Sequence, residues 1–259
     1  MNIAYNADCL DIMRNMPNDY IDLTVTSPPY DNLRTYNGFN FDWQKTIQQL
    51  YRITKDGGVV VWIVNDATVN GSETGTSFKQ ALYAKECGFN LHDTMIWQKD
   101  GIAFPETNRY YPIFEYMFVW SKGKPKTFNG ICDRKNKHCG TLVHGTNRQL
   151  DGTLKNVSGA KLGRKVKEYG TRFNVWKISS EHNNKTGHPA VFPLQLAKDH
   201  ILSWSKEGDV IFDPFLGSGT TRLAAFDLNR QFIGCEISKE YFDKQEERFN
   251  IYTSMSSTN

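Results

Sequence analysis

A glycine-rich turn between an apolar strand and a helix is the feature that most constrains the fold of this chain. Residues 209–212 read as a buried strand, residues 213–221 (DPFLGSGTT) follow it, and residues 220–228 are predicted to form a helix. In such a turn the backbone N–H groups and the helix N-terminus can hold a small anionic group. The segment therefore predicts an α/β fold with a ligand site at the carboxyl end of a strand.

Strand and helix signals alternate along most of the 259 residues, a pattern typical of a doubly wound sheet with helices on both faces. The predicted strands are residues 21–25, 59–64, 91–98, 113–121, 209–212 and 231–235, and the predicted helices are residues 43–53, 77–87, 194–204, 220–228 and 239–249. A loop separates the aromatic-rich strands 91–98 and 113–121, so we expect them to form an antiparallel edge. The predicted fold class is α/β, with a mostly parallel sheet.

Positive charge is concentrated in the middle of the chain. Residues 121–187 carry 15 Lys and Arg against 4 Asp and Glu, a net charge of +11, whereas the whole chain has a net charge of +3. A solvated charged face usually mixes both signs, so this excess favours a surface that contacts phosphates. An ordinary solvated face is the alternative.

The longest uninterrupted apolar run, residues 59–64, is far too short to cross a membrane. Five cysteines are scattered through a chain that is too large to need a disulfide framework. We therefore expect a soluble cytoplasmic protein with no membrane partner. No metal site is expected, because the spacing of the candidate ligands matches no standard zinc finger. These candidates are Cys132, His138, Cys139 and His144.

An acidic residue completes the candidate cofactor site. Glu236 ends the strand after the turn and lies 19 residues beyond Gly217, the place of the acid that binds ribose hydroxyls in dinucleotide folds. The turn lacks a third glycine, having Arg222 there, and it lacks the Gly-Lys-Ser/Thr of a P-loop. The pattern indicates a ribose without a pyrophosphate. A surface acid without a ligand is the alternative.

A second motif, residues 26–30 (TSPPY), follows the predicted strand 21–25. It places the hydroxyl of Ser27, the proline-fixed carbonyl of Pro28 and the aromatic face of Tyr30 side by side. Such a set suits the binding of a flat ring that carries an amine. A strand-terminating turn without chemistry is the alternative.

Together and in this order, the two motifs resemble those of the DNA amino-methyltransferases, which transfer a methyl group from S-adenosylmethionine to the exocyclic amine of cytosine or adenine. The resemblance spans residues 7–236 and is weak in the basic stretch. It implies the S-adenosylmethionine-dependent methyltransferase fold, S-adenosylmethionine as cofactor and double-stranded DNA as partner, as in restriction-modification systems. By resemblance alone, a homodimer is expected to be possible.

The resemblance also assigns roles to individual residues. Ser27, Pro28, Pro29 and Tyr30 form the expected catalytic segment, with Tyr30 stacking on a base that has left the duplex. The expected cofactor-binding residues are Asp8 and Cys9 at the adenine, Asp213, Phe215, Gly217 and Gly219 at the methionine part, Thr220 or Thr221 near its carboxylate, and Glu236 at the ribose. Residues 188–193 are expected to complete the methionine pocket.

Methyl transfer to an exocyclic amine poses a physical problem, because the nitrogen lone pair is delocalised into the ring. If the two N–H bonds donate to the Ser27 hydroxyl and the Pro28 carbonyl, the nitrogen approaches tetrahedral geometry and its lone pair is aimed at the methyl group. No covalent enzyme intermediate is needed. The chain has no Pro-Cys motif of the kind that ring-carbon methylation requires.

The order of the motifs, with the basic stretch between them, resembles the circularly permuted (beta) class, in which the target-recognition region is inserted centrally. We therefore expect a catalytic domain of residues 1–121 and 188–252, a basic recognition region of residues 122–187 and a polar tail of residues 253–259. Residues 31–40 are expected either to close over the extruded nucleotide or to form an ordinary surface loop.

The target remains open between several classes. Serine at position 27 is the commoner companion of cytosine N4 in this family, and Asp or Asn at that place is the commoner companion of adenine N6. The resemblance therefore favours cytosine N4 over adenine N6. An RNA or protein amine as target, and an inactive nucleic-acid-binding module, are the remaining alternatives.

Overall fold

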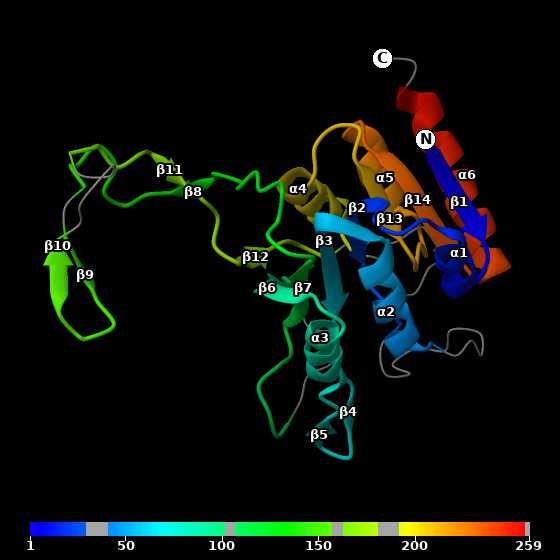
Figure 1. The fold of residues 1–259 in the computed structure, drawn as a ribbon, viewed down its shortest axis with the longest axis horizontal. Helices are drawn as coiled ribbons and strands as arrows, with labels where there is room; N and C mark the ends of the chain where they lie inside the picture. The colour runs from blue at the N-terminus through cyan, green and yellow to red at the C-terminus, as the bar shows by residue number, and fades with distance from the viewer. Residues whose placement is uncertain (30–40, 102–106, 144, 157–162, 181–191, 257–259) are drawn as a thin grey trace. The chain divides into compact units, whose positions relative to one another are not determined.

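The structure is a computed structural model that describes residues 1–29, 41–101, 107–143, 145–156, 163–180 and 192–256 (Figure 1). The chain divides into two compact units. Met1–Asn129 and Asn174–Asn259 together form the larger unit, and Gly130–Phe173 form the smaller one. Within the described ranges, no helix has the length and apolar character that a membrane span requires.

An eight-stranded sheet with the order β1-β14-β13-β2-β3-β7-β6-β12 is the framework of the larger unit. Neighbouring strands are parallel from β1 to β3, β7 runs antiparallel to β3 and β6, and β12 is parallel to β6. The strands are β1 (Asn2–Asn6), β2 (Ile21–Thr26), β3 (Thr54–Val64), β6 (Asn90–Gln98), β7 (Phe114–Ser121), β12 (Val175–Lys177), β13 (Val210–Asp213) and β14 (Gln231–Glu236). The predicted α/β fold with a mostly parallel sheet is confirmed.

Helices cover both faces of this sheet (Figure 1). They are α1 (Cys9–Asn15), α2 (Trp43–Ile53), α3 (Thr76–Glu86), α4 (Leu194–Trp204), α5 (Thr220–Asp227) and α6 (Lys239–Ser256). Helices α1, α2 and α3 pack on one face, and α4 and α5 pack on the other. Because side chains alternate along a strand, β3 supplies both cores. Val60, Trp62 and Val64 enter the first core, and Val59, Val61 and Ile63 enter the second.

Several elements differ from the predicted ones. β1, α1 and β12 have no predicted counterpart, and a short hairpin of β4 (Thr68–Val69) and β5 (Ser72–Glu73) precedes α3. β3 begins at Thr54 instead of residue 59, and α6 continues to Ser256, into the segment predicted as a polar tail. β1 is an edge strand with partly exposed side chains, and β12 has only three residues. Neither strand therefore carries the continuous apolar run of a buried strand.

Arg222 occupies the position of the third glycine in the dinucleotide-binding fingerprint, and it holds α6 and β1 against α5. Its buried guanidinium donates to Asn2 Oδ1 at 2.7 Å from Nε, and to Gln245 Oε1 at 2.9 Å and Glu246 Oε1 at 2.6 Å from Nη1. It also lies over the ring of Phe249, 3.9 Å from the centroid. The departure from the three-glycine fingerprint therefore has a structural reason.

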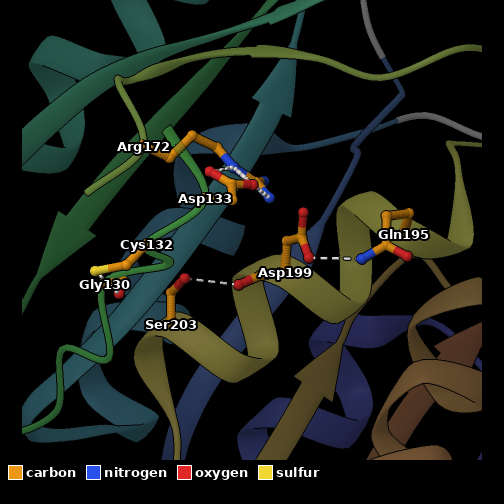
Figure 2. Close-up of polar contacts among 7 residues, drawn as sticks. All are labelled: Gly130, Cys132, Asp133, Arg172, Gln195, Asp199 and Ser203. Carbon is orange, nitrogen blue, oxygen red and sulfur yellow. Dashed lines mark hydrogen bonds and ion pairs between the residues drawn. The ribbon is translucent and has the colours of Figure 1, made fainter. Parts of the chain in front are cut away.

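Buried polar contacts also fix helix α4. Gln195 Nε2 donates to Asp199 Oδ1 at 2.7 Å, and Ser203 Oγ donates to the carbonyl oxygen of Asp199 at 2.7 Å (Figure 2). The bond from Gln195 helps to satisfy the buried Asp199 carboxylate, and the bond from Ser203 satisfies a backbone carbonyl of the helix.

The smaller unit is built from short antiparallel pairs. β8 (Arg134–Lys135) pairs with β11 (Tyr169–Gly170), and β9 (Thr146–Arg148) pairs with β10 (Leu154–Asn156). Arg172 donates from Nε to Asp133 Oδ2 at 2.9 Å (Figure 2). The unit is narrower than the basic region 122–187 expected from the sequence, because β12 belongs to the main sheet.

Candidate functional site

A cavity of about 300 Å³ lies at the carboxyl ends of four neighbouring parallel strands, β1, β14, β13 and β2. Its walls include residues 7–9 after β1, Ile237 after β14, residues 214–218 after β13, and Ser27 with Pro29 after β2. Parallel pairing brings these strand ends to the same edge of the sheet. The two motifs, which are far apart in the sequence, therefore share one cavity.

Glu236 lies in the cavity wall beside the glycine turn. Its Oε2 accepts from the Gly217 N–H at 2.8 Å, and its Oε1 accepts from the Ser238 N–H at 2.9 Å. Burial raises the pKa of this carboxyl above its ordinary value. Since each carboxylate oxygen can accept a second hydrogen bond, the side chain can also bind hydroxyl groups of a ligand.

The two glycines are required by the turn itself. Gly217 and Gly219 have φ of +50° and +81°, in the left-handed region that favours glycine. Gly217 N–H donates to Glu236, and Gly219 N–H donates to the Leu216 carbonyl at 2.9 Å. Gly217 lines the cavity, whereas a Cβ at Gly219 would lie 3.3 Å from Gln245 of α6. The N–H groups of both glycines are therefore hydrogen-bonded within the protein. The absence of a side chain at Gly219 allows the turn to pack closely against helix α6.

Asp213 and Thr221 are not among the residues that line the cavity, although Thr220 is. Asp213 Oδ1 accepts from Thr26 Oγ1 at 2.7 Å and from the Phe215 N–H at 3.0 Å. Complete burial raises the pKa of this carboxyl to about 6, against the opposing effect of its hydrogen bonds with Thr26 and Thr221. Thr221 Oγ1 also donates to the Val25 carbonyl at 3.2 Å. Both side chains therefore support the end of β2 from behind the wall.

Aromatic side chains complete the apolar wall. Phe41, Phe192 and Tyr241 line the cavity together with Phe215. Phe41 and Phe215 pack edge to face, with ring centroids 5.0 Å apart. Aromatic faces offer large contact areas to a flat heterocycle. Phe192 belongs to the segment 188–193 that was expected at the methionine pocket. Phe41 and Tyr241 come from segments distant in sequence from the motifs, so no local pattern identifies them.

Two cationic side chains that the sequence motifs do not identify also lie in the cavity wall. Arg14 of α1 pairs with Asp11 at 2.6 Å, and Lys45 of α2 pairs with Asp42 at 2.9 Å. Asp42 caps α2, and its bond from the Lys45 N–H lowers the pKa of its carboxyl. Arg14 and Lys45 line the cavity because α1 and α2 pack beside it, and the sequence alone does not show this packing.

Asp8 and Cys9 line the cavity, as does Cys235. Asp8 Oδ1 accepts from the Leu10 N–H at 2.7 Å and so caps α1. Burial raises the pKa of the Cys9 thiol to about 12 and that of Cys235 well above its ordinary value. Both are neutral thiols at neutral pH and do not act as thiolate nucleophiles.

The structure describes only part of the expected catalytic segment, residues 27–30. Ser27 and Pro29 line the cavity, and Pro28 is buried between them. The expected stacking residue Tyr30 lies outside the described residues, as do the loop 31–40 and residues 188–191 of the expected methionine pocket.

Comparison with known proteins places the chain among the DNA methylases. A family model described as DNA methylase matches residues 21–247. The orphan methyltransferase M.BamHII of Bacillus amyloliquefaciens is 58% identical over 240 residues, 90% of this chain and 89% of that protein. The type II methyltransferase M.BglII of Bacillus subtilis is 28% identical over 260 residues, 94% of this chain and 67% of that protein.

Solved structures share the fold. The cytosine-N4-specific PvuII DNA methyltransferase superposes with a TM-score of 0.69 at 20% identity, covering 96% of this chain and 86% of that chain. The complex of M1.HpyAVI with S-adenosylmethionine superposes with a TM-score of 0.63 at 24% identity, covering 96% of this chain and all of that chain. The chain thus belongs to the N4/N6 amino-methyltransferase family of DNA methylases.

Proposed function

We propose that this protein transfers a methyl group from S-adenosylmethionine to the exocyclic amine of a base extruded from double-stranded DNA, with cytosine N4 as the favoured position. One observation carries the proposal: Ser27 of the catalytic motif and Glu236 of the cofactor motif line the same cavity. Its volume of about 300 Å³ is of the order found for small-molecule sites. The family match supports DNA as the substrate.

The residues present fit S-adenosylmethionine. Glu236 would accept hydrogen bonds from the ribose hydroxyls, Asp8 would lie near the adenine, and Phe215 would supply apolar contact; all three residues line the cavity. Thr220, the first residue of α5, offers a hydroxyl at a helix N-terminus, which suits the methionine carboxylate. When bound, S-adenosylmethionine supplies an electrophilic methyl group.

At the acceptor side, Ser27 and Pro28 bind and orient the amine. The Ser27 hydroxyl and the Pro28 carbonyl accept its two N–H bonds, which directs the nitrogen lone pair away from the ring and into the cavity. Tyr30 stacks on the extruded base, since an amine paired inside the duplex cannot be reached. In the proposed circularly permuted arrangement, the basic recognition region lies in the sequence between the two segments of the catalytic domain and contacts the DNA.

Asp213 is a positioning residue in this scheme. Its Oδ1 binds both Thr26, next to Ser27, and the N–H of Phe215 in the cofactor turn. It therefore fixes the distance between the two halves of the cavity without contacting either substrate. The resemblance implies a direct contact of Asp213 with the methionine part, but Asp213 is not among the residues that line the cavity.

Variants of Ser27 and Glu236 should separate transfer from donor binding. Ser27→Ala should leave the Kd for S-adenosylmethionine nearly unchanged and lower single-turnover transfer by about 10²-fold, because it removes an acceptor that acts mainly in the transition state. Glu236→Ala should weaken donor binding about tenfold or more, because ribose hydroxyls lose their partner. Calorimetry and transfer of labelled methyl groups measure the two effects. Equal losses of donor binding in both variants would contradict this division.

Asp213 can be tested by comparing two substitutions. Asp213→Asn keeps an Oδ1 acceptor for Thr26 and Phe215, whereas Asp213→Ala removes it, so only the alanine variant should lose most of the transfer rate. Burial raises the pKa of the Asp213 carboxyl in the folded protein to about 6 from 3.8. The wild type should therefore lose stability relative to Asp213→Asn as the pH rises between these values. Urea unfolding across that range measures the difference, and a constant difference would refute the assignment.

The identity of the product tests the proposed function itself. Duplex DNA methylated by the wild-type protein is digested to nucleosides, which are identified by mass spectrometry, with Ser27→Ala as the matched negative control. We expect N4-methylcytosine. N6-methyladenine as the sole product would overturn the cytosine assignment, and labelled RNA or protein with unmodified DNA would overturn DNA as the substrate.

A further inference from the structure

The smaller unit contains an antiparallel ribbon formed by β9 and β10. Arg148 lies opposite Leu154, Asn147 opposite Lys155, and Thr146 opposite Asn156. The connecting turn is closed by hydrogen bonds from the Gln149 N–H to the Thr153 carbonyl at 2.7 Å and from the Gly152 N–H to the Gln149 carbonyl at 3.0 Å.

Both faces of this ribbon are exposed. All six residues of β9 and β10 are exposed, and so is Leu150 in the turn. A two-stranded hairpin with no buried face is marginally stable alone, so this ribbon contributes little to a core. Its side chains are instead available to a partner along the whole of its length.

The chemistry of the ribbon favours nucleic acid as that partner. Asn147, Arg148, Lys155 and Asn156 carry the amide, guanidinium and ammonium groups that bind base edges and phosphates. Arg148 uses Nη1 for a bond of 3.2 Å to the Gly152 carbonyl, and a guanidinium has five N–H donors in all. The ribbon can therefore donate several further hydrogen bonds.

Asp151 is the only acidic residue within the ribbon, residues 146–156, and its side chain is hydrogen-bonded within the turn. Its Oδ1 accepts from the Thr153 N–H at 2.9 Å and from Thr153 Oγ1 at 2.7 Å. Across Gly130–Phe173 there are ten Lys and Arg against three Asp and Glu, and Asp133 is paired with Arg172. The electrostatic field of this unit therefore attracts a polyanion.

We propose that the β9–β10 ribbon enters the major groove of double-stranded DNA and reads base edges through Arg148 and Asn156, a proposal that rests on the proposed function. Because side chains alternate along a strand, the register places these two residues on the same face of the ribbon. The major groove, about 12 Å wide, admits a two-stranded ribbon, in which the strands lie about 4.8 Å apart. Arginine pairs in bidentate fashion with guanine and asparagine with adenine. Phosphate contacts come from basic residues elsewhere in the unit, such as Lys135 of β8, which is exposed.

Selection of bound duplexes tests this role separately from catalysis. The full-length protein and its variants bind a pool of randomised duplexes, and the bound sequences are determined alongside the salt dependence of the Kd. Arg148→Ala and Asn156→Ala should each weaken binding to the preferred sequence about 5- to 100-fold and relax the preference at one or two positions. Lys135→Ala, the matched control, should weaken binding to all sequences alike and reduce the log–log salt slope by about one.

Arg148→Lys keeps the charge and removes the bidentate geometry. It should relax the sequence preference while leaving the salt slope unchanged. If both Arg148 variants retain the wild-type preference, the ribbon does not read bases and the proposal is overturned. A wild-type protein that selects sequences through Arg148 and methylates nothing would instead refute the proposed function and leave the ribbon's role supported.

Discussion

The oxygen Oδ1 of Asp213 joins the two halves of the site. It binds Thr26 at the end of β2 and the Phe215 N–H at the start of the cofactor turn. The strands that end at Thr26 and Asp213, β2 and β13, are parallel neighbours in the sheet. The hydrogen bonds of Asp213 therefore set the distance between the ends of the two strands. A buried carboxylate is costly unless it is hydrogen-bonded, which explains why several donors converge on it.

Different parts of the cavity wall carry different functional groups. Glu236 offers carboxylate oxygens, Ser27 offers a hydroxyl, and the rings of Phe41, Phe192, Phe215 and Tyr241 supply apolar and aromatic surface to the same cavity. Cys9 and Cys235 are also in the wall, but burial raises the pKa of each thiol and keeps it neutral. The site therefore suits direct transfer to a positioned amine better than attack by an enzyme nucleophile.

The sequence predicts the strands and helices of the central fold well, because the runs in β3, β13 and β14 are buried on both faces and read as continuous apolar segments. Edge strands such as β1 and β12 lack that signal. Each motif follows a strand, so the location of the site was also predictable. Whether an acid at a strand end faces a cavity or lies behind it depends on tertiary packing, so the sequence does not show that Asp213 lies outside the cavity lining. The positions of Phe41 and Lys45 in the cavity wall depend on tertiary packing in the same way.

A crystal structure of the protein with S-adenosylhomocysteine tests the central claim most directly, because it locates the nucleoside relative to the two motifs. The account predicts ribose hydroxyls within hydrogen-bonding distance of the Glu236 carboxylate and the sulfur atom on the side of Ser27. A ligand bound away from Glu236, or one whose sulfur faces away from Ser27, would contradict the account.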